Sequence, residues 1–119
     1  MKKPHSLELS FNSLDVADRI VVTTNLNQTI TTIDNAETIG AVLTFLKRHT
    51  HSWTVPRGGV PVARLRLNFY QGDKILGNIG VEKGFLTAHQ HGGFYSKVLD
   101  EGERPNLLEL IGLEANGDT

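Results

Sequence analysis

The sequence contains no cysteine, and this absence excludes several kinds of chemistry at once. Disulfide bridges, thiol nucleophiles and thiolate metal sites all need that residue, and a chain without it suits a reducing compartment. The sequence also lacks any apolar run near the roughly 18 residues that a membrane-spanning helix needs. No apolar segment follows Met1-Lys2-Lys3, so the sequence predicts no signal peptide and a cytoplasmic protein.

An excess of charge of either sign is also missing. The chain has twelve Lys and Arg residues and thirteen Asp and Glu residues, so its net charge is −1. A nucleic-acid-binding domain usually has a strongly basic surface, so we expect no nucleic-acid partner. The missing apolar run likewise predicts no membrane partner. With 119 residues, 39% hydrophobic and 21% charged, the chain is typical of one globular domain spanning residues 1–119. Residues 1–5 and 114–119 are expected to be disordered or frayed tails.

The common enzyme motifs are absent as well. The sequence has no Gly-x-Ser-x-Gly, no Walker lysine motif and no His-Glu-x-x-His. A small hydrolase or isomerase with an unrecognised site stays open as an alternative. It would need a deep pocket lined by titratable groups.

Alternating apolar and polar residues dominate the middle of the chain. The alternation over 62–70 predicts a half-buried strand, and it resumes after a turn at 71–73. The loop length sets which residues pair, and a slip of one residue would move every side chain of a strand to the other face. A three-residue loop keeps the apolar residues of both strands on one face, because it pairs Phe69 with Ile75 and Leu65 with Ile79. Gly77 would then lie opposite Leu67, where another element can approach closely. One face should contain Leu65, Leu67, Phe69, Ile75, Ile79 and Val81.

Further elements are predicted on both sides of this pair. Segments 18–24, 29–33, 85–89 and 94–98 favour strands, 53–55 suits a short strand, and 6–11 fits either a short edge strand or an ordered tail. Residues 34–49 predict a long helix, with Asp34 as N-cap and Glu37 completing a capping box. Its apolar stripe is Ala36, Ile39, Val42, Leu43 and Leu46. A second, short helix has Pro105 in its first turn, a stripe of Leu107, Leu108 and Ile111, and ends at Gly112.

This order of elements predicts the fold class. Runs of strands without intervening helices indicate an α+β fold, here a single antiparallel sheet in the order β-β-α-β-β-β-β-α with two helices packed on one face.

The predicted order resembles folds of the TATA-binding-protein type and the helix-then-meander unit of β-lactamase inhibitor proteins. Several segments also resemble those of small bacterial proteins to which no activity is attached. They are Asp18-Arg19-Ile20, the Trp53…Pro56 loop, Phe69-Tyr70, Leu76-Gly77…Gly80-Val81 and Leu107-Leu108…Ile111-Gly112. These resemblances imply a fold and leave the function open.

Two His-x-His pairs are the first candidate site: His49 with His51, and His89 with His91. Residues two apart on a strand share a face, so each pair could present two imidazoles to one zinc ion. The alternative is that histidine is simply tolerated in two loop regions. Nothing in the sequence brings the two pairs together.

The second candidate site is the polar face of the central hairpin together with the loop 53–61. Arg64 and Arg66 could grip a phosphate or carboxylate, and Tyr70 could offer a stacking surface. Trp53 and Arg57 of the loop would add contacts, because Trp is enriched at interface hot spots. This interpretation predicts a non-enzymatic binding domain for a partner protein or a small anionic ligand. The alternatives are a plain solvated face and a core Trp53, so exposure of Trp53 discriminates between them.

Overall fold

The computed structural model describes residues 9–51, 53–55, 63–82, 85–90, 93–99 and 103–112. Its six strands form one sheet in the order β2-β1-β3-β4-β5-β6 with antiparallel neighbours. The strands are β1 (Arg19–Thr24), β2 (Thr29–Ile33), β3 (Leu65–Gln71), β4 (Lys74–Glu82), β5 (Phe85–Gln90) and β6 (Gly93–Val98). The helices are the 3-10 helix η1 (Asn12–Val16) and the α-helices α1 (Ala36–Lys47) and α2 (Glu103–Leu110).

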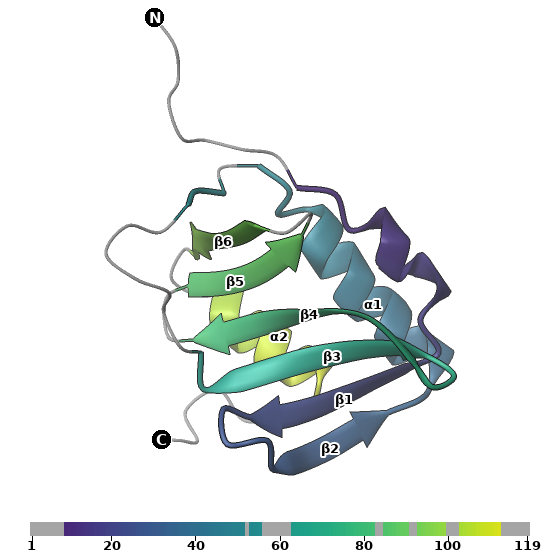
Figure 1. Cartoon of the computed structure of the whole chain (residues 1–119). Coiled ribbons are helices and arrows are strands. Elements are labelled where there is room, and N and C mark those ends of the chain that lie inside the picture. The colour runs from purple at the N-terminus through teal and green to yellow at the C-terminus, as the bar shows by residue number, and fades with distance from the viewer. Residues whose placement is uncertain are drawn as a thin grey trace, which may run out of the picture.

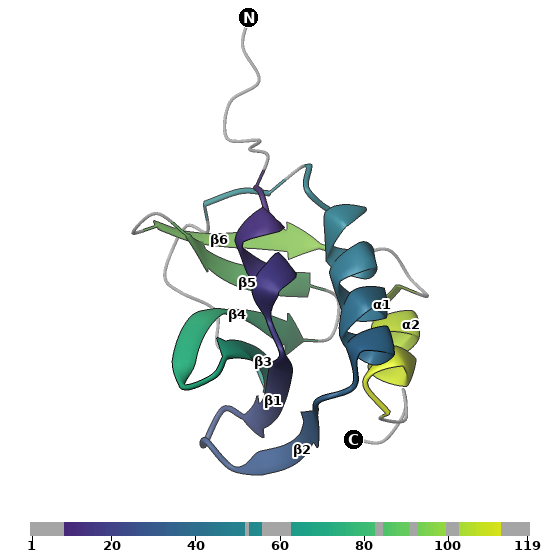
Figure 2. The same ribbon diagram turned by 90° about the vertical axis from the view of Figure 1, so that its right-hand side faces the viewer.

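Both α-helices lie on the same side of the sheet. They stand behind it in Figure 1 and to its right in Figure 2, where η1 lies in front of the strands. The predicted α+β class, with one antiparallel sheet and two helices on one face, is therefore confirmed. The opposite side of the sheet has no helix against it among the described residues, and we call it the open face.

The core fills the space between the sheet and the helices. On α1 the buried residues are Ile39, Val42, Leu43, Phe45 and Leu46, and on and just after α2 they are Leu107, Leu108 and Ile111. The strands contribute alternate residues, chiefly Ile20, Val22, Leu67, Phe69, Ile79, Val81, Leu86 and Ala88. Because side chains alternate along a strand, the residues between these project from the open face.

The pairing of β3 with β4 differs from the predicted register. Leu67 lies opposite Ile79 and Phe69 opposite Gly77, so the predicted pairing of Phe69 with Ile75 is wrong. Ile75 is 50% exposed and lies opposite Tyr70, outside the core face. The other five residues assigned to that face are buried or pack against the core.

A β-bulge accounts for the difference. The strands are joined by a two-residue turn at Gly72-Asp73, where Gly72 has a φ of 60°, as the first position of a type II′ turn requires. The register then shifts between Phe69 and Tyr70, which leaves Leu76 as an extra residue in β4. This insertion brings the apolar residues of the two strands back onto one face. A tight turn and a continuous core face are therefore compatible here.

Gly77 does receive a close neighbour, as expected. A Cβ atom at this position would lie 3.4 Å from Leu14 Cδ2 of η1. The residue opposite is Phe69 instead of Leu67, because of the bulge. Helix η1 thus packs directly on β4 where the strand has no side chain.

Helix α1 begins one residue later than predicted. Asn35 is its N-cap, and the Asn35 Oδ1 accepts a hydrogen bond of 2.7 Å from the backbone N–H of Thr38. Asp34 therefore does not cap the helix, and Ala36 is exposed at its first position. The rest of the predicted apolar stripe is buried, with Phe45 added to it.

Residues 9–11 form no strand. The Leu9 N–H donates to the carbonyl of Thr50, and Phe11 packs edge-on against Trp53 with ring centroids 5.9 Å apart. In segment 53–55, Thr54 pairs with the sheet through an isolated bridge to Ser96. Residues 1–8 and 113–119, which include the predicted tails, lie outside the described residues.

Candidate functional site

The open face of β3 is the centre of the candidate site. Its side chains are Arg66, Asn68 and Tyr70, which alternate with the buried Leu67 and Phe69. All three are half-buried. In the register of the sheet, each stands between one residue of β1 and one of β4.

Tyr70 is covered by Arg19, a residue that sequence reasoning did not assign to the site. The Arg19 guanidinium lies 4.7 Å from the centre of the Tyr70 ring, and its Nη2 donates to the carbonyl of Gly72 at 3.3 Å. Asp18 Oδ2 accepts from the Gly72 N–H at 3.0 Å. The start of β1 thus holds the tip of the β3–β4 hairpin. The ring expected to be free for stacking already has a cation on it.

Arg64 has an internal partner as well. Its Nε lies 3.3 Å from Glu82 Oε2, and its backbone N–H donates to Glu82 Oε1 at 3.2 Å. The side chain of Arg64 is 65% exposed and that of Glu82 16%. Arg64 and Arg66, which were predicted to bind one anion together, therefore differ in their pairing. The charge of Arg64 is balanced by Glu82.

Asn68 is fixed by the neighbouring strand. Its Nδ2 donates to the carbonyl of Val21 at 2.9 Å and to Thr23 Oγ1 at 3.1 Å. Because Thr23 Oγ1 accepts this bond, its own hydroxyl hydrogen is available for another acceptor. Asn78 of β4 lies directly opposite Asn68.

Arg66 is the remaining cation of this face among the described residues. Within the described part of the chain its guanidinium makes no hydrogen bond and no ion pair. Thr23 lies opposite it on one side and Gly80 on the other. A half-buried guanidinium with a neighbouring hydroxyl and without an internal acceptor is suited to an external anion.

The open face is covered at one place. A side chain at Gly80 would collide with Thr87 Oγ1 and with Ala63 Cβ, which fill the space over this glycine. Thr87 is 6% exposed and Ala63 likewise 6%. Accessible polar groups are therefore concentrated over β1 and β3 rather than over the centre of β4 and β5.

Trp53 takes no part in an accessible surface. Its side chain is 0% exposed, and its Nε1 donates to the carbonyl of His49 at 2.6 Å. The expectation of a Trp53 anchor for binding is corrected: this side chain belongs to the core, where it packs on Phe11. Arg57 lies outside the described residues.

The histidines are distributed over different parts of the fold. The His49 ring stacks on Phe45 with centroids 4.4 Å apart, and its Nδ1 lies 2.7 Å from the Phe45 carbonyl oxygen. His51 is exposed, and its carbonyl accepts from Lys97 Nζ at 2.9 Å. His89 contacts the Phe94 ring edge-on at 5.2 Å.

These positions separate His49 from His89. Ala88 is buried in the core, so His89, its neighbour on β5, projects from the open face, whereas His49 packs on the helix layer. Among the described residues no group of three or more His, Cys, Asp or Glu side chains comes together. His91 lies outside these residues, so a zinc site that includes it stays a prediction.

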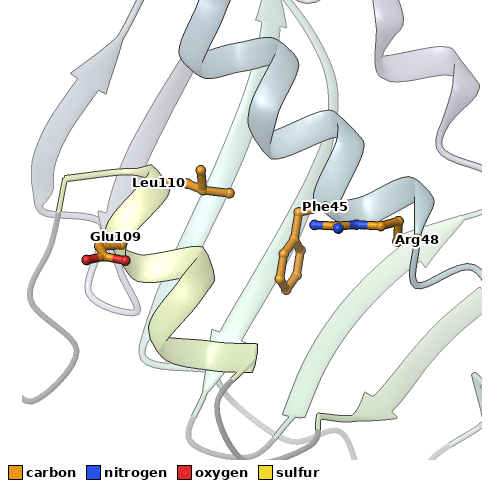
Figure 3. Close-up of a pocket in the computed structure, with 4 residues that line it drawn as sticks. All are labelled: Phe45, Arg48, Glu109 and Leu110. Carbon is orange, nitrogen blue, oxygen red and sulfur yellow. The ribbon is translucent and has the colours of Figure 1, made fainter.

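A shallow hollow lies between the two α-helices. It has a volume of about 430 Å³ and is lined by Phe45, Arg48, Glu109 and Leu110. In Figure 3 Phe45 and Leu110 lie between the helices, whereas Glu109 points away from α1. No ion pair joins Arg48 to Glu109 in the described structure. Among the described residues, the lining of this hollow contains neither the nucleophile nor the acid–base pair that an active site of a hydrolase would need.

None of the helices that the structure describes is long and apolar enough to cross a membrane. Comparisons with protein-family models, with curated proteins and with solved structures gave no match. The resemblances noted from the sequence therefore stay predictions, and the function has to be argued from the site itself.

Proposed function

We propose that this protein is a small non-enzymatic binding domain that holds an anionic group, on a small ligand or a partner protein, against its open face. Arg66 is the central contact. The observation that supports this most directly is the contrast among three arginines of one face. Arg19 is engaged by Tyr70 and Gly72 and Arg64 by Glu82, whereas Arg66 has no partner in the described part of the chain.

The surroundings of Arg66 suit a carboxylate or phosphate. A guanidinium can donate two parallel hydrogen bonds to such a group, and these charge-assisted bonds are stronger than those between neutral groups. Thr23, held by Asn68, can donate a third hydrogen bond from its hydroxyl. Partial burial of Arg66 weakens the screening by water, which favours pairing with an anion.

A cytoplasmic location is part of the proposal. It is supported by the cysteine-free sequence, which suits a reducing compartment. We infer a protein or small-molecule partner and no nucleic acid, because the net charge is only −1.

The test is a titration with inorganic phosphate, and separately with acetate, at constant ionic strength and followed by amide NMR shifts. We expect the shifts to centre on Thr23, Arg66 and Asn78. Arg66→Gln should weaken binding about tenfold, because it removes a charge-assisted pair. Arg48→Gln is the matched control, since Arg48 is exposed at the end of α1 on the helix side and also lacks a partner in the described structure.

Two outcomes would overturn the proposal. One is equal phosphate and acetate binding by the Arg66→Gln variant and the unaltered protein. The other is loss of binding in Arg48→Gln alone, which would move the site to the hollow between α1 and α2.

A further inference from the structure

Strand β2 is the outer strand at one edge of the sheet. It pairs with β1 on its inner side, and Figure 1 shows it at the lower margin of the sheet with no described element beyond it. Backbone groups alternate in direction along a strand, so about half of the N–H and C=O groups of β2 point away from β1. The other edge differs, because Thr54 bridges to Ser96 on the outer side of β6.

The composition of β2 favours further pairing. All five of its residues are Thr or Ile, the β-branched types that favour strands. No charged residue occurs anywhere between Arg19 and Asp34. Edge strands are commonly protected by lysine, proline or a bulge, and this one has only a bulge, at the Val22–Thr23 step of its pairing with β1.

Two exposed apolar side chains lie in the same hairpin. Leu26, in the turn before β2, is 77% exposed, and Ile30 within the strand is 43% exposed. The segment therefore combines apolar surface and zero charge with backbone groups that no described strand pairs. That combination suits a partner strand that is itself uncharged.

We infer that β2 pairs with β2 of a second copy of this chain, antiparallel and about a two-fold axis. A two-fold axis makes one patch contact itself, so a patch with charges of one sign would repel its own copy. The uncharged stretch from Ile20 to Ile33 avoids this repulsion. The two sheets would join into one continuous sheet, with the helices of both copies on the same side. This interface is separate from the site at Arg66 and does not depend on the proposed function.

The dimer should be weak. One pair of five-residue edge strands buries much less than the roughly 1,200 Å² of a standard interface. We therefore expect a dissociation constant on the order of tens of micromolar or weaker. Sedimentation velocity over a concentration series should show the average mass rising toward twice that of the chain.

Ile30→Lys is the first variant, because it places a charge at the self-pairing edge. We expect it to weaken dimerisation at least tenfold. Ile75→Lys is the matched control: Ile75 is also an exposed isoleucine in a strand, at 50%, but lies at the β3–β4 hairpin. Equal weakening by both variants, or a mass that stays monomeric at every concentration, would overturn the inference.

The absence of cysteine allows a second and independent test. Directly opposed residues of antiparallel strands have Cα atoms about 4.5–5.5 Å apart, within the range that a disulfide spans. Thr31→Cys or Thr32→Cys, whichever lies nearer the axis, should form a covalent dimer on mild oxidation several-fold faster than Thr44→Cys on α1. Equal rates for all three would count against self-pairing. A monomer that takes up an unrelated extended peptide along β2 would also overturn it, in favour of strand addition by another protein.

Discussion

On the helix side of β3, Leu67 and Phe69 are 0% exposed, whereas Arg66, Asn68 and Tyr70 of the same strand project from the open face and stay half-buried. The first group is held by apolar burial, which needs the right volume and no particular partner. The second is held by specific pairs, such as Arg19 on Tyr70 and Asn68 on Thr23. Adjacent residues of one strand thus depend on different forces. Substitutions on the two faces should therefore lower the free energy of unfolding by different amounts.

The largest effect is expected from Phe69→Ala. This side chain is fully buried, so its loss removes apolar contacts and leaves a cavity, at a cost of about 3–5 kcal/mol in the free energy of unfolding. Ile75→Ala, on the exposed side of the bulge, should change it by less than about 1 kcal/mol. Urea denaturation measures both. Similar losses at the two positions would show that Ile75 is a core residue and that the bulge is misplaced.

A smaller effect is expected where the open face is covered. Gly80→Ala forces a methyl group against Ala63 and Thr87 and should destabilise the fold by about 1–3 kcal/mol. Gly40→Ala is the control, because a Cβ at Gly40 in α1 meets no atom within 4 Å. There the change should stabilise the helix by about 0.5–1 kcal/mol. In thermal unfolding, Gly80→Ala should lower the melting temperature and Gly40→Ala should raise it. An unchanged melting temperature for Gly80→Ala would mean that this part of the open face is not covered.

The contact between Arg19 and Tyr70 should contribute still less to the free energy of unfolding. A double-mutant cycle with Arg19→Gln and Tyr70→Leu is expected to give a coupling energy of about 0.5–1 kcal/mol, the usual value for a cation on an aromatic ring at an accessible site. Denaturation of the two single variants and the double variant provides it. Strict additivity would show that the guanidinium does not rest on the ring in solution.

Arg64→Gln should alter stability least among these charged residues. Its partner Glu82 is mostly buried but Arg64 itself is 65% exposed, so water and salt screen the ion pair to at most about 0.5 kcal/mol. The measurement is urea denaturation at low and high salt, where the small difference should vanish as salt is added. A loss that persists at high salt would indicate that Arg64 matters by packing, not by charge.

The zinc hypothesis can be tested in the same comparison of faces, because His49 lies on the helix side and His89 on the open side. A site using both histidine pairs requires His49→Ala and His89→Ala to abolish the same zinc-dependent rise in melting temperature. Since the two side chains project from different layers, we expect no shared loss. Untagged protein and zinc titration provide the measurement, and a joint loss would establish a shared site.

The amino-acid sequence by itself determined the periodic elements. Alternation over residues 62–70 and the helical spacing from Ile39 to Leu46 depend on neighbours in the chain, so the strands, the helices and most of the core face could be predicted from them. The sheet with two helices on one face followed from their order.

Contacts between distant segments decided the rest. The bulge at Leu76 exists because a two-residue turn must be reconciled with a continuous core face, and no local pattern shows which residue is extra. Trp53 is buried because Phe11, far away in sequence, packs against it. Arg19 reaches Tyr70, and Arg66 is left as the arginine of the open face without a partner in the described chain, only once β1 has paired with β3. Pairing between strands that are distant in sequence determines the neighbours of each polar side chain. Those neighbours in turn determine which polar side chains stay available to a ligand.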